Sequence, residues 1–284
     1  MLIVMIEIFN LIIVNPIINC LLLAYQALFF LHVPFALGFS IIAITVLVRL
    51  LLYPFTAQQL RASKKMQELA PHLAKVKELH KGDPGKLQSE TMGLYKAHGV
   101  NPAAGCLTMV IQLPIIWGIY SVFDKVIKLN PNETVSAINK IAYVDFLKLK
   151  TSWDTYFFFL PLEAHPSDLL AKTSYLILLV PVITGALQFV QSKMMFKKSP
   201  QPKITDSKKE KSQPDFASAF QSQALYIFPV MFGFLSYTFP LGLSLYWNTF
   251  TIFGIIQQYR LQKEASIASP AVIQNNKKEK RKNG

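Results

Sequence analysis

Residues 38–54 read GFSIIAITVLVRLLLYP, an apolar run that contains one charged side chain, Arg49. A helix of about 20 apolar residues crosses the hydrocarbon core of a bilayer, so we expect a membrane span at residues 34–58. A guanidinium at this depth costs about 2.5–3.5 kcal/mol on insertion scales, and it needs a partner or water. We therefore expect Arg49 to have a function inside the membrane. The alternative is that it snorkels to the cytoplasmic end of its helix.

Charged residues are scarce in much of the remaining chain. Of the 284 residues, 52% are hydrophobic and 16% are charged, whereas an average soluble domain has roughly 25% charged residues. Uncharged stretches at 103–123, 173–192 and 216–259 predict four more spans, at residues 102–124, 169–192, 218–238 and 241–260. The sequence therefore argues against a soluble enzyme. It predicts an all-α integral membrane protein with a bundle of five transmembrane helices.

The basic residues indicate how these spans are oriented. The net charge is +13, and Lys and Arg gather in blocks beside the apolar runs. Basic loops next to spans face the cytoplasm, which puts residues 59–101, 193–217 and 261–284 inside and the loop at 125–168 outside. We therefore expect a multi-pass membrane protein with its amino terminus outside and its carboxyl terminus in the cytoplasm. Its basic tail is expected to be disordered.

Residues 1–33 are apolar, but a spanning helix here would bury several polar side chains. They are Asn15, Asn19 and Gln26, and Pro16 lies among them. We interpret the segment as an amphipathic helix in the outer interface of the membrane. A sixth span is the alternative that the sequence leaves open.

Residues 59–101 are charged and have helical periodicity. Apolar residues recur there at three-and-four spacing, and Gly82-Asp83-Pro84-Gly85 interrupts the pattern near its middle. The segment is therefore predicted to be a cytoplasmic helical hairpin. Because nothing in the sequence ties it to the bundle, we expect it to be mobile, either as a solvated linker or as a docking element for a partner.

Polar side chains recur at helical spacing within the expected spans. These positions are Thr45, Gln112, Thr184, Gln188, Gln191, Ser244, Trp247, Asn248, Thr251 and Gln258. Polar groups in lipid find partners or water, so the stripes predict a hydrated cavity that includes Arg49. The alternative is a set of hydrogen bonds that only holds the helices together.

The sequence contains no recognisable catalytic or metal-binding pattern. Apart from Asp124 at the end of one span, the expected spans contain no Asp or Glu; the histidines have no ligand spacing, and no phosphate-binding glycine motif is present. Cys20 and Cys106 lie in apolar segments and form neither a metal nor a disulfide pattern. We therefore expect no enzyme activity, no cofactor and no metal. A secondary transporter of an organic anion bound at Arg49 is the alternative function, although the two halves show no internal repeat.

Three ordered motifs resemble the YidC-type membrane protein insertases, the family that includes the Oxa and Alb proteins. They are GFSIIAITVLVRLLLYP at 38–54, NPAAGCLTMVIQLPIIWGIY at 101–120 and FPLGLSLYWNTFTIFGIIQQY at 239–259. Thr108 stands where the family often has proline, and Asn248 stands where an apolar residue is commoner. Only about 34 residues precede the first expected span, which resembles the short form without the large periplasmic domain.

The resemblance implies a hydrophilic groove within the bundle and a chaperone that inserts nascent transmembrane segments into the bacterial inner membrane. Arg49 would keep the groove wet and positive, and Gln112 and Trp247 would line it. Pro181 and Tyr246 would contact the substrate helix. The implied partners are nascent membrane proteins, the ribosome through the basic tail, the Sec translocon and the lipid bilayer.

Overall fold

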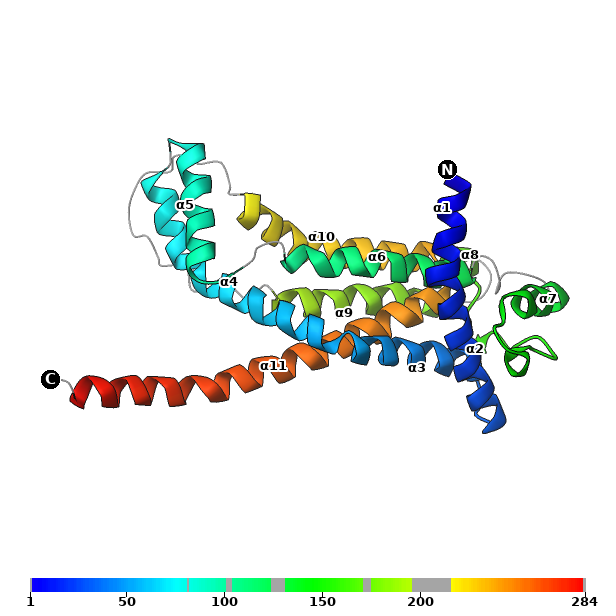
Figure 1. The fold of residues 1–284 in the computed structure, drawn as a ribbon. Helices are drawn as coiled ribbons and strands as arrows, with labels where there is room; N and C mark the ends of the chain where they lie inside the picture. The colour runs from blue at the N-terminus through cyan, green and yellow to red at the C-terminus, as the bar shows by residue number, and fades with distance from the viewer. Residues whose placement is uncertain are drawn as a thin grey trace.

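The computed structural model describes residues 2–80, 82–100, 104–123, 131–170, 175–195 and 216–282. This part of the chain is almost wholly helical, which confirms the all-α class (Figure 1). Helices occur at each of the five expected spans: α3 (Ala36–Leu51), α6 (Ala104–Val122), α9 (Leu179–Met195), α10 (Phe216–Thr238) and α11 (Leu241–Lys282). Helix α9 packs against both α10 and α11, and α11 also packs against α3.

Length and composition support some of these helices as membrane spans. Within the described residues, two helices are long and apolar enough to cross a bilayer, Ile6–Phe30 and Tyr175–Met195. A third candidate is the pair Ala36–Leu51 and Tyr53–Val76, which is bent by 62°. Pro54 lies just after this bend and has no amide N–H to continue the hydrogen bonds of α3. The count of five spans remains a prediction.

The amino-terminal segment forms α1 (Leu2–Phe9), the π-helical turn η1 (Asn10–Val14) and α2 (Asn15–Phe30). It crosses the end of the bundle (Figure 1), and its apolar side packs against α3 and α6. Two of its polar side chains, Asn19 and Gln26, bond to the segment that follows α6. Asn19 Nδ2 donates to Ile141 O at 3.0 Å, Asn19 Oδ1 accepts from Tyr143 N at 2.7 Å, and Gln26 Nε2 donates to Lys148 O at 3.3 Å. These side chains therefore attach the amino-terminal segment to the part of the chain that follows α6.

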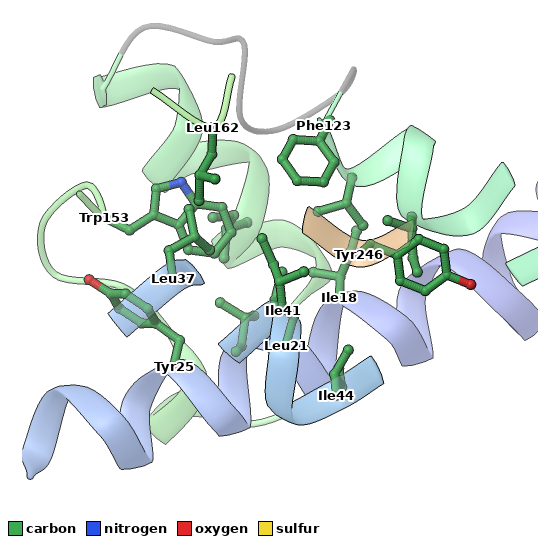
Figure 2. Close-up of a cluster of buried hydrophobic side chains, with 14 of the residues drawn as sticks. Ile18, Leu21, Tyr25, Leu37, Ile41, Ile44, Phe123, Trp153, Leu162 and Tyr246 are labelled. Atoms are coloured by element: carbon green, nitrogen blue, oxygen red, sulfur yellow. The ribbon is translucent and has the colours of Figure 1, made fainter. Parts of the chain in front are cut away.

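The part of the chain that follows α6 is a small cap at one end of the bundle. It contains α7 (Pro131–Ile141), η3 (Asp145–Leu147), the antiparallel pair β1 (Tyr156–Phe157) and β2 (Leu160–Pro161), and α8 (Pro166–Leu169), and η4 (Tyr175–Leu178) leads into α9. Trp153 and Leu162 of the cap lie with Tyr25 and Leu37 in a buried apolar cluster (Figure 2). The cap and α2 therefore share one hydrophobic core with α3.

The segment predicted to be a hairpin forms α4 (Tyr53–Leu79) followed by α5 (Pro84–Ala97). Asp83 caps α5, because its Oδ1 accepts from Lys86 N at 3.0 Å. The mobility expected of this hairpin stays a prediction, but the structure shows contacts between the hairpin and the bundle. Helix α4 packs against α6 and α11, and Gln67 Nε2 donates to Met195 O at the end of α9. An amide contact of this kind leaves no trace in the hydrophobic periodicity.

Two basic segments have different outcomes. The tail at 261–284 was expected to be disordered, whereas α11 extends through it to Lys282. The tail is rich in Lys, Glu, Gln and Ala, which favour helix. The loop predicted at 193–217 lies mostly outside the described residues, because α9 ends at Met195 and α10 begins at Phe216.

Candidate functional site

Arg49 is buried between α3 and α11. Its side chain is 5% exposed, its Nη2 donates to Phe250 O at 2.6 Å, and its Cζ lies 3.3 Å from the centroid of the Phe250 ring. Its Nε is buried without a hydrogen-bond partner among the described residues, and no ion pair to Arg49 forms in that part of the chain. The guanidinium thus points into the bundle and is held by a carbonyl dipole and an aromatic face.

Gln191 of α9 approaches the same face of α11 as Arg49. A Cβ at Gly254 would lie 2.4 Å from Gln191 Nε2 and 2.7 Å from Arg49 Nη2. The amide and the guanidinium therefore meet over a position of α11 that has no side chain. This contact brings together two of the residues predicted to line the groove.

Gln112 and Tyr246 form a polar pair beside this site. Gln112 Nε2 donates to the Tyr246 hydroxyl at 2.6 Å, and the Tyr246 and Phe250 ring centroids are 5.8 Å apart. Tyr246 is 1% exposed, although we expected it to contact a substrate helix. In this structure the hydroxyl joins α6 to α11.

Thr184 belongs to a separate group of hydroxyls. Its Oγ1 donates to Val180 O at 2.9 Å and lies 3.1 Å from Ser236 Oγ, which in turn lies 2.8 Å from Ser244 Oγ. The chain links α9, α10 and α11, and all three hydroxyl side chains are buried. These contacts match the alternative of interhelical hydrogen bonding.

The remaining predicted residues have varied surroundings. Thr45 is buried and its Oγ1 donates to Ile41 O of its own helix at 2.6 Å. Trp247 packs its ring against Phe232, and its Nε1 and the Asn248 Oδ1 are both buried without partners among the described residues. Gln188 is partly buried on α9.

Pro181 lies in the contact between α9 and α10 and is buried. Its carbonyl oxygen is 3.3 Å from the position that a Cβ would take at Gly233. The structure therefore separates Pro181 from the surroundings of Arg49 and places it against a neighbouring helix.

Sequence reasoning missed two residues of α11 that touch Arg49, namely Phe250 and Gly254. Phe250 uses its backbone and its ring, and Gly254 has no side chain, so neither adds to a polar stripe. Sequence reasoning also missed Gln257, whose Nε2 donates to Thr56 Oγ1. A glycine inside an expected helix was the one signal that pointed to a close approach.

The site concentrates hydrogen-bond donors and one positive charge inside an apolar bundle. Its described contacts include no carboxylate or histidine beside Arg49 that would act as an acid or base. The arrangement is suited to attracting and solvating polar or negatively charged groups within a low-dielectric environment.

Residues 28–268 match the model of a protein family described as 60Kd inner membrane protein. The membrane protein insertase YidC of Granulibacter bethesdensis is 30% identical over 234 residues, which make up 82% of this chain and 36% of that protein. The protein of the same name from Syntrophus aciditrophicus is 32% identical over 228 residues, 80% of this chain and 33% of the relative. The chain thus spans about a third of the length of these relatives.

A solved structure is also similar. It is a crystal structure of an active YidC insertase with its first transmembrane domain resolved, and its sequence identity to this chain is 27%. The TM-score is 0.45, and the match covers 78% of this chain and 41% of that one.

Proposed function

The chain belongs to the 60Kd inner membrane protein family, and from this premise we propose that it is a membrane protein insertase and folding chaperone. It would move nascent transmembrane segments from the cytoplasm into the lipid bilayer without covalent chemistry. Relatives from two bacteria carry the name insertase, which supports this function over the transport of an organic anion. The proposal concerns the helical region that these relatives share with the chain.

The buried Arg49 carries this proposal. An apolar helix enters lipid favourably by itself, whereas the polar end that must cross meets the full cost of desolvation. A positive charge held by Phe250 O offers that end hydrogen bonds inside the bundle. Trp247 Nε1 and Asn248 Oδ1, which have no partner among the described residues, offer further hydrogen bonds. The barrier for the polar end would fall accordingly.

The proposed groove lies between α3, α9 and α11, around Arg49 and Gln191. We assign the other polar positions of these helices and of α6 to its walls: Thr45, Gln112, Thr184, Gln188, Trp247 and Asn248. The apolar substrate helix would slide along the outward faces of α9 and α11, where Val182 is 64% exposed and Ile256 is 49% exposed. Contact of that helix with the buried Pro181 and Tyr246 would require α9 and α11 to part from their neighbours.

The remaining parts of the chain would set its orientation and its partners. We propose that the cap lies outside the membrane with the amino-terminal helix in the outer interface, and that the hairpin and the carboxyl end face the cytoplasm. The basic extension of α11 would contact the ribosome, because Lys and Arg displace counterions from phosphate. The Sec translocon is a further proposed partner.

Site-specific crosslinking to ribosome-bound nascent chains tests this function. A photoreactive residue at Gln112 or Gln191 should crosslink to the leading polar segment of a single-spanning protein. The same residue at Phe234, which is 63% exposed on α10, serves as the control and should not. Equal crosslinking at all three positions would contradict a groove.

Insertion in cells tests the same function independently. Depletion of the protein should leave small single-spanning proteins uninserted, and unchanged insertion in cells without a second copy would rule the proposal out. Saturable anion uptake into proteoliposomes that Arg49→Ala abolishes would instead support the transporter.

A further inference from the structure

A glycine of α11 faces the guanidinium of Arg49. The three atoms nearest to a Cβ at Gly254 would be Gln191 Nε2 at 2.4 Å, Arg49 Nη2 at 2.7 Å and Arg49 Cζ at 3.4 Å. All three belong to the ends of flexible side chains, and none is backbone. A side chain at this position would therefore displace the amide and the guanidinium but would leave the helices where they are.

The same glycine leaves the carbonyl group that holds Arg49 uncovered. Gly254 follows Phe250 by four residues, which is one helical turn. Side chains in a helix lean toward its amino terminus, so a side chain at position 254 would cover the turn at Phe250. Because Gly254 has none, Arg49 Nη2 reaches Phe250 O at 2.6 Å while Cζ lies over the Phe250 ring.

We propose that Gly254 is a positioning residue for Arg49. Its missing side chain lets α11 hold the guanidinium on the Phe250 carbonyl and lets Gln191 approach from α9, so that the positive charge has one defined place in the groove. The inference rests on the proposed insertase function, and Gly254 acts through Arg49 without contacting the substrate.

The test is a double-mutant cycle on the full chain in proteoliposomes, with insertion of a short single-spanning protein as the readout. Gly254→Ala should lower the insertion yield roughly threefold or more. In the Arg49→Lys background the same change should lower it by less than about twofold, because an ammonium has no planar fork to displace. Gln191→Ala combined with Gly254→Ala should restore part of the loss by freeing the space at 2.4 Å.

Two further measurements separate positioning from packing. Gly93→Ala on α5 is the matched control, because a Cβ there would have nothing within 4 Å, and it should insert like the wild type. The thermal unfolding of Gly254→Ala should not shift downward, since alanine favours helix more than glycine does. Equal losses in the Arg49 and Arg49→Lys backgrounds, or full activity of Gly254→Ala, would overturn the positioning role.

Failure of the proposed function gives a different result. Wild-type proteoliposomes would then insert no more substrate than empty liposomes, and the Arg49 variants would not differ from them. Insertion that depends on Arg49 but not on Gly254 would support the insertase function and contradict only the inference about Gly254.

Discussion

The contact between α9 and α10 uses glycine to bring two backbones together. A Cβ at Gly185 would lie 3.2 Å from Pro229 O, and one at Gly233 would lie 3.3 Å from Pro181 O. Each helix thus has a proline four residues before a glycine, and each glycine faces the carbonyl of the other helix's proline. Neither neighbour can move without moving its helix. This contact fixes the distance between the two helices.

The contact between α3 and α11 uses glycine for a different purpose. The space over Gly254 is filled by the tips of Arg49 and Gln191, and these can rotate away. A larger residue here would move polar groups and spare the backbone. The comparison distinguishes two uses of glycine in a helix contact. Gly185 and Gly233 face backbone atoms and support the fold, whereas Gly254 faces long polar side chains and supports a function.

The largest effect on folding is expected at the backbone contact. Gly185→Val should lower the free energy of unfolding by about 2–3 kcal/mol, because overpacking forces the two helices apart. Thermal unfolding in detergent would measure it. Gly93→Val is the control, since open space surrounds Gly93. Unchanged stability of Gly185→Val would remove the distinction between the two contacts.

Substitution of Arg49 should have the opposite effect to substitution of Gly185. It should lower insertion activity and leave stability almost unchanged. Arg49→Ala is expected to lower insertion about tenfold, which corresponds to about 1.4 kcal/mol in the barrier, while Arg49→Lys should lower insertion less than Arg49→Ala because it keeps the charge. Stability should hardly fall, because the change removes a buried charge that has no ionic partner among the described residues.

Insertion assays and unfolding curves on the same preparations would check both parts. A variant Arg49→Ala that unfolds as readily as Gly185→Val would show that Arg49 is a packing residue. Equal loss of insertion in the Ala and Lys variants would instead show that the guanidinium itself is required.

The helices themselves could be predicted from the sequence, because long apolar runs and Gly82-Asp83-Pro84-Gly85 mark where helices begin and end. What each polar residue contacts could not be predicted. Asn19 and Gln26 suggested a membrane surface but bond the backbone of the cap, more than 120 residues away. The periodicity of polar residues shows which face of a helix is polar, but it does not show what that face contacts.

The site was predictable only where side chains carry the signal. Arg49 and Gln191 stood out as polar groups in apolar runs, and the structure brings them together. Phe250 holds Arg49 through its backbone carbonyl and its ring. Gly254 leaves space for Arg49 because it has no side chain. Such contacts depend on the distance between helices, which no local pattern encodes.

The hydroxyl chain of Thr184, Ser236 and Ser244 should have a smaller effect. Ser236→Ala removes its central member and should lower stability by about 0.6 kcal/mol, the mean for interhelical hydrogen bonds in membranes. Adding Ser244→Ala should cost less than the sum of the single changes, because the two share one bond. Thr249→Val is the control, because its hydroxyl bonds Leu245 O within α11. A loss of insertion without a loss of stability would show that these hydroxyls act on the substrate as part of the groove wall and do not only link the helices.

The smallest effect concerns how the hairpin is held to the end of α9. The last carbonyls of a helix have no partner within it, and Gln67 of α4 and Gln262 of α11 donate to those of Met195 and Met194. Gln67→Ala should leave global stability unchanged. It should speed amide exchange in α4 by roughly twofold to tenfold, since one hydrogen bond contributes about 0.5–1.5 kcal/mol. Gln262→Ala removes a hydrogen bond from the same end of α9 but changes no residue of α4. Mass spectrometry should therefore find that the amides of α4 exchange at the wild-type rate in this variant. Equal acceleration of exchange by both variants would show that α9, α4 and α11 open together. The contact of the hairpin with α9 would then resemble the rigid α9–α10 contact and not the α3–α11 contact, where side chains can rotate away.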